Sequence, residues 1–333
     1  MPRVRSQWLL PGAIGALLAG LCPAQIVVVT QQAATWTQAL PAISPPPRDQ
    51  LAMAQDSAFQ QAVLFGGCCD NSGNAFGDTW TWDGTNWTHK SPAGSPPARW
   101  GHAMAYDAAH GQVALFGGIN FPNVFGDTWV WDGINWTQKT PANNPPPRFY
   151  HGMAYDATHG QVVLFGGLAT TEGGALGDTW IWDGTNWTQM TPAKSPEKRY
   201  GLVVSGDARG QVVLFGGAGQ SIPSFFGDTW VWNGGNWSHK ALLRNPPART
   251  FPGMASGAVQ GEVVLFGGDG KSGRLGDTWV WNGFSWAQQT PAVSPPPRDN
   301  PTMVSGTANG QVVLFGGQGL QANLLADTWV WLP

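Results

Sequence analysis

Six arginines and six aspartates recur at regular intervals and are the first candidates for chemistry. Each aspartate begins an Asp-Thr-Trp triplet. A ring of guanidinium groups could bind acidic ligands, but a feature repeated in every unit usually serves the unit, and guanidinium–carboxylate pairing satisfies both groups. We therefore predict Arg–Asp pairs within the repeats and keep Arg99, Arg148 and Arg199 as secondary ligand-binding candidates. The arginines are Arg48, Arg99, Arg148, Arg199, Arg249 and Arg298, and the aspartates are Asp78, Asp127, Asp178, Asp228, Asp277 and Asp327.

Residues that differ between repeats lie directly after these arginines. Trp100 is outside the three fixed positions that hold the other tryptophans after residue 24, so it is either an extra packing residue or a stacking platform for a sugar or an apolar side chain. His102 and His151 share one repeat position, which favours a structural role over metal ligation. A mixture of aromatic rings, carboxylates and imidazoles suits polar, ring-bearing ligands. The remaining candidates are Asp49, Phe149, Tyr150, Tyr200, Asp299 and Asn300.

The elements that position these side chains follow from an internal repeat. Phe-Gly-Gly occurs six times at spacings of 51, 49, 50, 51 and 49 residues. One unit predicts four strands, at 148–156, 162–165 and 179–182 and from 187 onwards, with apolar residues alternating at period two. Six such units of four antiparallel strands predict an all-β, six-bladed propeller.

Antiparallel order brings the arginines, the glycine pairs and the loops of variable length to one face. Those loops hold 8 to 10 residues between each Gly-Gly and its aspartate, whereas the turns at the opposite face are short and nearly constant. Loops on a rigid scaffold usually carry function, so we expect ligand binding on the variable face. His110 and His159 lie in turns of the far face, where we expect solvated side chains. Asn120, Glu172, Asp269, Lys271 and Arg274 could extend the variable-face site, as could Asp70.

The two ends of the repeat array complement each other. The sixth unit stops after its third strand, and residues 34–38 resemble a fourth strand without the preceding three. The interval from Trp36 to Arg48 is 12 residues, as it is from the fourth-strand tryptophan to the next arginine in the other units. We predict that the N-terminal strand completes the last blade, which would remove an exposed sheet edge.

The repeat resembles the kelch repeat: a hydrophobic strand ending in Gly-Gly, a variable loop, an Asp-x-Trp strand, and a further Trp after a turn. The resemblance covers nearly all of the chain after residue 24 and is to exported repeats like those of the galactose oxidase central domain. It implies a six-bladed β-propeller. The chain departs from the pattern in having tryptophan where many kelch repeats have tyrosine, two residues after the first Trp. These positions are Trp82, Trp131, Trp182, Trp232, Trp281 and Trp331.

The N-terminus predicts export. Arg3 and Arg5 precede an apolar stretch at 8–21 and small residues near residue 24, a pattern typical of a signal peptide. A lipoprotein signal at Cys22 is less favoured because Leu21 is bulky. We expect a signal peptide at 1–24, a single domain at 25–333, and a secreted, periplasmic or cell-surface location.

Charge and cysteine content limit the function classes. The net charge is −3, and it would become −5 without Arg3 and Arg5, so nucleic-acid binding is not expected. No apolar run after residue 24 approaches the roughly 18 residues of a membrane span. Cys68 and Cys69 are adjacent and would form only a strained disulfide. We expect a monomer without a cofactor.

These observations favour a non-enzymatic module that binds an extracellular glycan or protein through the variable face. A second hypothesis is a kelch-type enzyme. Galactose oxidase and its relatives use a copper site with two tyrosines, two histidines and a cysteine-modified tyrosine. Tyr150, His151, Tyr200 and His102 are of suitable types, but the two cysteines lie in another repeat. A sialic acid mutarotase-like enzyme is also consistent with an exported six-bladed kelch fold, and so is a structural or adhesive surface protein.

Overall fold

The computed structural model describes residues 34–69, 73–207, 209–220, 224–257, 262–306 and 311–332. The predicted signal peptide lies outside these residues, as does the loop candidate Asp70. One compact unit spans Ala33–Pro333 and contains all of the described strands. In the part of the chain that is described, no helix is long and apolar enough to cross a membrane.

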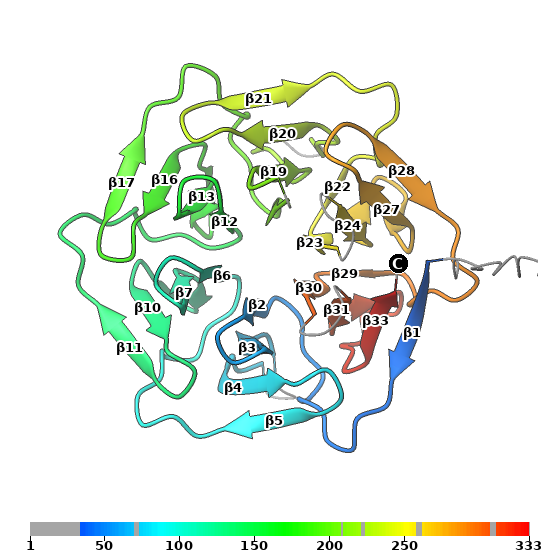
Figure 1. The fold of residues 1–333 in the computed structure, drawn as a ribbon, viewed down its shortest axis with the longest axis horizontal. Coiled ribbons are helices and arrows are strands. Elements are labelled where there is room, and N and C mark those ends of the chain that lie inside the picture. The colour runs from blue at the N-terminus through cyan, green and yellow to red at the C-terminus, as the bar shows by residue number, and fades with distance from the viewer. Residues whose placement is uncertain are drawn as a thin grey trace, which may run out of the picture. The chain divides into compact units, whose positions relative to one another are not determined.

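Six four-stranded antiparallel sheets are arranged in a ring (Figure 1). The first strand of each sheet lies nearest the centre and the fourth lies at the rim. The fold is therefore the predicted all-β, six-bladed propeller.

Blades 1 to 3 contain, from the centre outwards, β2 (Ala52–Asp56), β3 (Gln61–Gly67), β4 (Phe76–Trp82) and β5 (Trp87–Lys90); β6 (Ala103–Asp107), β7 (Gln112–Phe116), β10 (Thr128–Trp131) and β11 (Trp136–Lys139); and β12 (Gly152–Asp156), β13 (Gln161–Phe165), β16 (Thr179–Trp182) and β17 (Trp187–Met190). Blades 4 to 6 contain β18 (Val203–Gly206), β19 (Val212–Phe215), β20 (Thr229–Trp232) and β21 (Trp237–Lys240); β23 (Gly253–Ser256), β24 (Val263–Phe266), β27 (Thr278–Trp281) and β28 (Trp286–Gln289); and β30 (Thr302–Ser305), β31 (Val312–Phe315), β33 (Thr328–Leu332) and β1 (Thr35–Ala39).

Short strands extend the loops on the variable face. These are β8 (Ile119–Asn120) with β9 (Asn123–Val124); β14 (Leu168–Thr170) with β15 (Gly173–Ala175); β22 (Arg249–Thr250) with β25 (Asp269–Gly270) and β26 (Gly273–Arg274); and β29 (Arg298–Asp299) with β32 (Gln318–Gly319).

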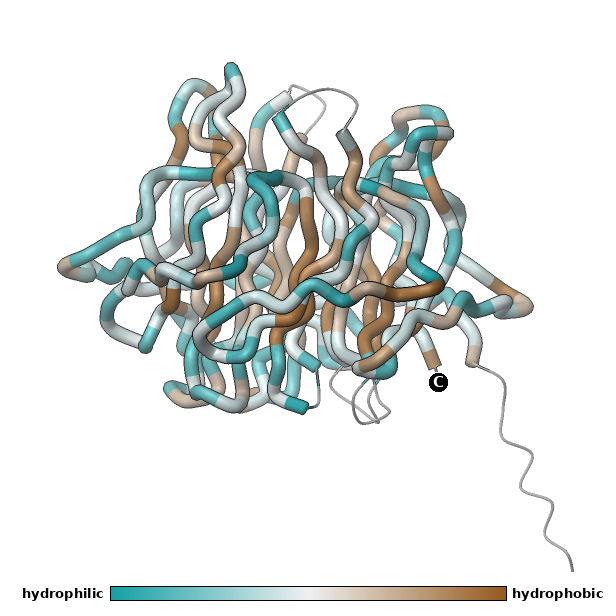
Figure 2. Tube along the Cα trace, turned by 90° about the horizontal axis from the view of Figure 1, so that it is seen from above, coloured by the Kyte–Doolittle hydropathy of each residue, from teal (hydrophilic) through white to brown (hydrophobic). Residues whose placement is uncertain are grey.

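The hydrophobic core lies between neighbouring blades. The second strand of each blade is apolar, as in the sequence Val-Val-Leu-Phe of β19, and its side chains are fully buried. One core cluster joins Phe116 of blade 2 to Met153, Leu164 and Trp182 of blade 3, and equivalent clusters join the other blades. Figure 2 shows hydrophobic residues concentrated in the strands and hydrophilic residues in the loops at both faces.

The first strand begins later than the sequence predicts. The pattern predicts a strand from residue 148 in blade 3, but β12 begins at Gly152. Tyr150 has a left-handed backbone conformation, with φ 58°, which an extended strand cannot include. The three residues after the arginine, 149–151 in this blade, therefore turn across the mouth of the ring instead of continuing the sheet.

The predicted closure by the N-terminal strand is confirmed. β1 pairs with β33 in antiparallel register, with Trp36 opposite Trp331, and completes blade 6. The Nε1 atom of Trp36 also donates a hydrogen bond of 2.9 Å to Oγ1 of Thr278 in blade 5. Every fourth-strand tryptophan makes the same bond to the threonine of the Asp-Thr-Trp triplet in the preceding blade. The other donor–acceptor pairs are Trp87–Thr328, Trp136–Thr79, Trp187–Thr128, Trp237–Thr179 and Trp286–Thr229.

Candidate functional site

The six arginines pair with the six aspartates, as the first of the two sequence hypotheses predicted. In blade 3, Nη1 and Nη2 of Arg148 each lie 2.8 Å from an oxygen of Asp178, and the arginine is fully buried. Nη1 also donates to the Gly166 carbonyl and Nε to the Pro146 carbonyl, both at 3.1 Å. All six arginines have this arrangement.

This pairing corrects the secondary interpretation of Arg99, Arg148 and Arg199 as ligand-binding residues. Their guanidinium groups are turned into the blade and do not line the central cavity. Burial alone would raise the pKa of Asp178, but the hydrogen bonds and charge of Arg148 and a hydrogen bond from Trp180 outweigh it and hold that pKa below its ordinary value. The ion pair is therefore a structural element of the blade.

Glycine pairs allow neighbouring blades to approach each other closely. Gly66 has φ 63°, and a Cβ on it would lie 2.5 Å from the carbonyl oxygen of Arg99 in the next blade. Only glycine fits both the backbone conformation and this contact. The end of each second strand is thus held against the residues that surround the mouth.

A ring of six residues surrounds the mouth of the central channel, and we call it the collar. Its members stand two residues after each arginine, and all have left-handed backbone conformations, with φ between 51° and 64°. Backbone N–H groups of the collar donate to the collar carbonyl of the preceding blade at 2.7–3.0 Å in five places. Between blades 6 and 1, Thr302 Oγ1 donates to the Leu51 carbonyl at 2.9 Å. The collar consists of Gln50, Gly101, Tyr150, Gly201, Phe251 and Asn300.

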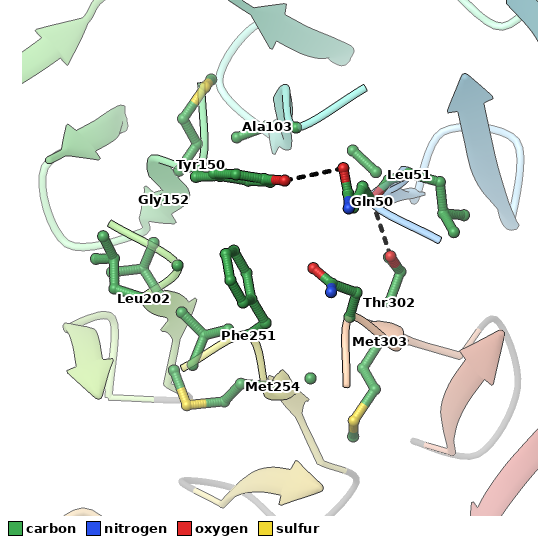
Figure 3. A pocket seen from close by; sticks show the side chains of 18 of the residues that line it. Gln50, Leu51, Ala103, Tyr150, Gly152, Leu202, Phe251, Met254, Thr302 and Met303 are labelled. Carbon is green, nitrogen blue, oxygen red and sulfur yellow. Dashed lines mark hydrogen bonds between the residues drawn. The ribbon is translucent and has the colours of Figure 1, made fainter. Parts of the chain in front are cut away.

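Four collar residues have side chains despite the left-handed backbone. For a residue other than glycine this conformation costs roughly 1–2 kcal/mol, and bulky residues rarely adopt it. Gln50, Tyr150 and Phe251 point into the opening (Figure 3). The collar side chains line a cavity of about 170 Å³ at the mouth. The strain is therefore located where a ligand would enter.

The two collar glycines make room for the aromatic rings of the following blades. A Cβ on Gly101 would lie 3.2 Å from Cδ1 of Tyr150, and one on Gly201 would lie 2.8 Å from Cε1 of Phe251. Aromatic residues and glycines thus alternate around this half of the collar.

The aromatic side chains form a continuous wall on blades 2 to 5. Tyr150 is at its centre, with ring centroids 5.7 Å from Trp100, 4.9 Å from Phe149 and 4.7 Å from Phe251. The ring of Tyr200 is stacked 6.5 Å from that of Tyr150. Trp100 is half-buried, so it both packs against its neighbours and keeps part of its ring open to solvent. We call Trp100, Phe149, Tyr150, Tyr200 and Phe251 the aromatic wall.

Acidic and amide side chains occupy the other half of the mouth. Gln50 Nε2 donates to Asp49 at 3.4 Å, and Asn300 Nδ2 donates to Asp299 at 3.3 Å. Tyr150 connects the two halves because its hydroxyl donates to Gln50 Oε1 at 2.9 Å (Figure 3). Asp49 and Asp299 are 4% and 9% exposed.

These two carboxylates differ in their partners. Arg274, on the β25–β26 hairpin of blade 5, places Nε 2.5 Å from Asp299 and also binds Gln318 and the Gly319 carbonyl. Burial, and next the charge of Asp299, raises the pKa of Asp49 to about 7. The loop candidate Arg274 therefore lies beside the collar, bound to Asp299, and does not line the mouth cavity itself.

His102 and His151 lie one residue beyond the collar, in slots between blades. Leu51 and Leu202 fill the equivalent slots of blades 1 and 4. The imidazole of His102 packs edge-on against Phe65, with ring centroids 5.6 Å apart. Both histidines are 5% exposed and line the mouth cavity, and their ring nitrogens lack hydrogen-bond partners among the described residues. Burial, with the charge of Arg99, lowers the pKa of His102 to about 3, so the ring is neutral.

The structure does not assemble the suggested copper ligands into one cluster. The Tyr150 hydroxyl binds Gln50, and the two imidazoles face Phe65 and Phe116 in separate slots. Within residues 34–332 as described, no three His, Cys, Asp or Glu side chains are placed to hold a metal. The sulfur atoms of Cys68 and Cys69 are in contact with each other, and Cys68 pairs through its backbone with Asp49.

A ring of methionines separates the mouth cavity from a second cavity at the far face. Its side chains line both cavities, and the far cavity has a volume of about 520 Å³. The residue five positions after the repeat arginine is valine in blade 4 and methionine in the other five blades. The repeat itself therefore supplies the side chains at the bottom of the mouth cavity. The ring consists of Met53, Met104, Met153, Val204, Met254 and Met303.

Sequence reasoning missed three residues of the mouth. Gln50 and Phe251 occupy the same repeat position as Tyr150, so aligning the six units at this column would have found them. Phe121 comes from the β8–β9 hairpin, and its ring lies 5.6 Å from Trp100. Nothing in the repeat indicates that contact, because the loop is outside the sixfold pattern.

The far-face histidines are not simply solvated, contrary to the expectation from sequence. His110 Nδ1 lies 2.8 Å from Asp107, and the ring covers the turn glycine Gly184 of the next blade. His159 makes the same contacts with Asp156 and Gly234. These side chains hold adjacent blades together at the far face.

Comparison with known protein families agrees with this geometry. The profile of the KLHDC2/KLHL20/DRC7 Kelch-repeats domain matches residues 19–183 and 161–332. The chain belongs to the kelch-repeat family. Kelch propellers are generally binding modules. No curated protein matches the chain.

Proposed function

We propose that this kelch propeller is a non-catalytic module that binds the terminal sugar of an extracellular glycan at the collar. The observation that supports this most strongly is the left-handed backbone of Gln50, Tyr150, Phe251 and Asn300. The same position is glycine in blades 2 and 4, so the fold does not require a side chain there. Glycine would adopt this backbone conformation without strain, so the presence of strained residues with side chains indicates that the side chains have a function.

The size and composition of the mouth favour a sugar. The cavity of about 170 Å³ is smaller than the 300–1,000 Å³ typical of sites for whole drug-sized ligands, so it suits one ring at the end of a longer chain. Tyr150 and Phe251, the members of the aromatic wall that line the cavity, offer apolar faces for stacking, and Gln50 and Asn300 offer amide donors and acceptors for hydroxyl groups. Export, predicted from residues 1–24, would place the module among extracellular glycans.

A glycan array with the secreted chain tests this proposal. We expect defined hits that are lost in Tyr150→Gly, because Tyr150 is central to the wall and contacts both halves of the mouth. Glu172→Gln is the control, since Glu172 is exposed at the tip of the β14–β15 loop. Tyr150→Gly should still melt cooperatively, at a lower temperature than the parent, because relief of the left-handed backbone offsets only part of the lost ring packing.

Other results would contradict the proposal. Hits that survive Tyr150→Gly would place the binding surface elsewhere. An array without hits, together with a protein captured in a pull-down that Tyr150→Gly abolishes, would replace the glycan with a protein partner.

A further inference from the structure

Of the two buried carboxyl groups beside the mouth, only one has an ion-pair partner in the described part of the chain. Asp49 and Asp299 occupy the same repeat position on blades 1 and 6, which are neighbours in the ring, and both are more than nine-tenths buried. Arg274 forms its ion pair with Asp299 and reaches Asp49 only as a more distant favourable charge, and no lysine or arginine forms an ion pair with Asp49 in the described structure. A buried carboxyl without a cation must either stay protonated or receive a positive charge from outside.

Among the described side chains that line the mouth cavity there is no lysine or arginine to bind an acidic ligand. The six repeat arginines are fully buried and use their guanidinium groups within their own blades. Arg274 is bound to Asp299, Gln318 and the Gly319 carbonyl. No aspartate or glutamate of the described chain lines the cavity either, and the carboxyl groups of Asp49 and Asp299 are buried beside it, next to the collar amides of Gln50 and Asn300.

The aromatic wall suits a positive group. Aromatic faces attract cations through their quadrupole, with the greatest effect where water is excluded. Tyr150 brings its ring to the acidic half of the mouth, and its pKa is raised by burial and next by the charge of Asp49. A positive group over the cavity-facing side of the Tyr150 ring would be attracted both by that ring and by the nearby charge of Asp49.

The two histidines line the same cavity, and with one ring N–H turned toward the backbone of Phe65 or Phe116 each neutral ring keeps its second nitrogen as an acceptor. Leucine fills the corresponding slots in blades 1 and 4, so packing alone does not require imidazole at 102 and 151. A neutral imidazole can accept a hydrogen bond, and an ammonium group has three donors and no acceptor. Buried acceptors of this kind therefore match a donor-rich ligand.

We propose that the collar selects a glycan whose terminal sugar carries a protonated amine, with the ammonium over the ring of Tyr150 and attracted by the charge of Asp49, which lies next to Gln50. This inference rests on the proposed glycan function and adds the charge of the ligand. The acetylated sugar lacks the charge and should bind more weakly. An anionic sugar should be rejected by Asp49 and Asp299.

Calorimetric titration of the full secreted chain near neutral pH tests the inference. The probes are a trimer of glucosamine, the matching trimer of N-acetylglucosamine, and sialyllactose. We expect the glucosamine trimer to bind about tenfold or more tightly than its acetylated counterpart, and sialyllactose not to bind.

Matched variants assign the charge selection to residues. Asp49→Asn should reduce the preference for the amine to less than about threefold, whereas Glu172→Gln, which removes the same charge from an exposed loop, should leave it unchanged. His102→Leu introduces the residue found at this repeat position in blades 1 and 4. It should weaken binding of the glucosamine trimer and leave the melting temperature unchanged.

The outcomes separate the two proposals. Equal affinity for both trimers, abolished by Tyr150→Gly, would overturn the amine selection and leave the glycan function intact. Binding of neither trimer, with tight binding of trilysine that depends on Asp49, would overturn both in favour of a basic peptide. Tight binding of sialyllactose would overturn the charge argument.

Discussion

Closure of the ring by β1 leads to a quantitative prediction about Trp36. This residue and Trp187 occupy the same position in blades 6 and 3, and both are at most 1% exposed. Each donates a 2.9 Å hydrogen bond to a threonine of the preceding blade. Each also packs against a tryptophan of its own blade, at 5.3 and 5.4 Å, and against a phenylalanine of the preceding blade, at 5.5 and 5.2 Å.

Because Trp36 and Trp187 have equivalent surroundings, replacing either should cost a similar amount of folding free energy. Replacing a buried tryptophan by alanine costs about 3–5 kcal/mol, and the lost indole hydrogen bond is part of that cost. We therefore expect Trp36→Ala and Trp187→Ala to lower the free energy of unfolding by equal amounts, within about 1 kcal/mol. Such a loss is a large fraction of the roughly 5–15 kcal/mol that stabilises a typical domain.

Urea denaturation followed by far-UV circular dichroism measures both variants, because the fluorescence signal itself changes when a tryptophan is removed. Equal m values would show that β1 unfolds together with the remaining strands. A cost below about 1 kcal/mol for Trp36→Ala beside 3–5 kcal/mol for Trp187→Ala would mean that β1 detaches from an otherwise folded ring, and would refute the closure argument.

Three further predictions concern the charges and the collar. Arg148→Ala should cost about 3–5 kcal/mol in urea denaturation because it leaves the Asp178 carboxylate buried without its partner, and a loss under about 1 kcal/mol would contradict a structural ion pair. The pKa of Asp49 is about 7 instead of the ordinary 3.8, so the folded protein binds a proton on this carboxyl group more tightly than the unfolded chain does. The stabilisation that protonation of Asp49 gives the folded state is present in full below about pH 4 and is lost as the pH rises through 7. Asp49→Asn should therefore be more stable than the parent at pH 8 by a few kcal/mol and equal to it near pH 4, whereas a constant difference across this range would oppose the assignment. Gly201→Ala should destabilise the protein and disturb the ring of Phe251, visible as changed aromatic resonances, because the added Cβ meets that ring and the backbone is left-handed.

The repeat made the scaffold predictable. Phe-Gly-Gly and Asp-Thr-Trp define the second and third strands of every blade, and the 12-residue interval from Trp36 to Arg48, the same as in the other units, identifies the closing strand from the sequence. The pairing of arginines with aspartates also followed from their equal number and regular spacing. A feature that repeats sixfold is fixed by local chemistry that a single unit already displays.

The mouth was less predictable because it depends on backbone conformation and loop contacts. The sequence predicted a strand through Tyr150, and only the left-handed backbone turns that side chain into the opening. Arg274 and Phe121 reach the collar and the aromatic wall from hairpins whose paths the repeat does not define. Trp100 stood out as an exception to the pattern, yet its role became clear only through the rings of Phe149 and Tyr150.

The collar explains how a regular scaffold can carry an irregular site. At five of its six junctions the hydrogen bonds run between backbone groups of successive blades, so they form whether the residue is glycine, asparagine or tyrosine. The side chain at each collar position is consequently free to vary, at the cost of a left-handed conformation when it is not glycine. Because the backbone ring fixes where each side chain enters the mouth, six positions suffice to place aromatic rings on one side and amides beside carboxylates on the other. Selection for a ligand can act on these positions, and the blades are preserved as long as the arginine, the glycine pair and the three tryptophans of each unit remain.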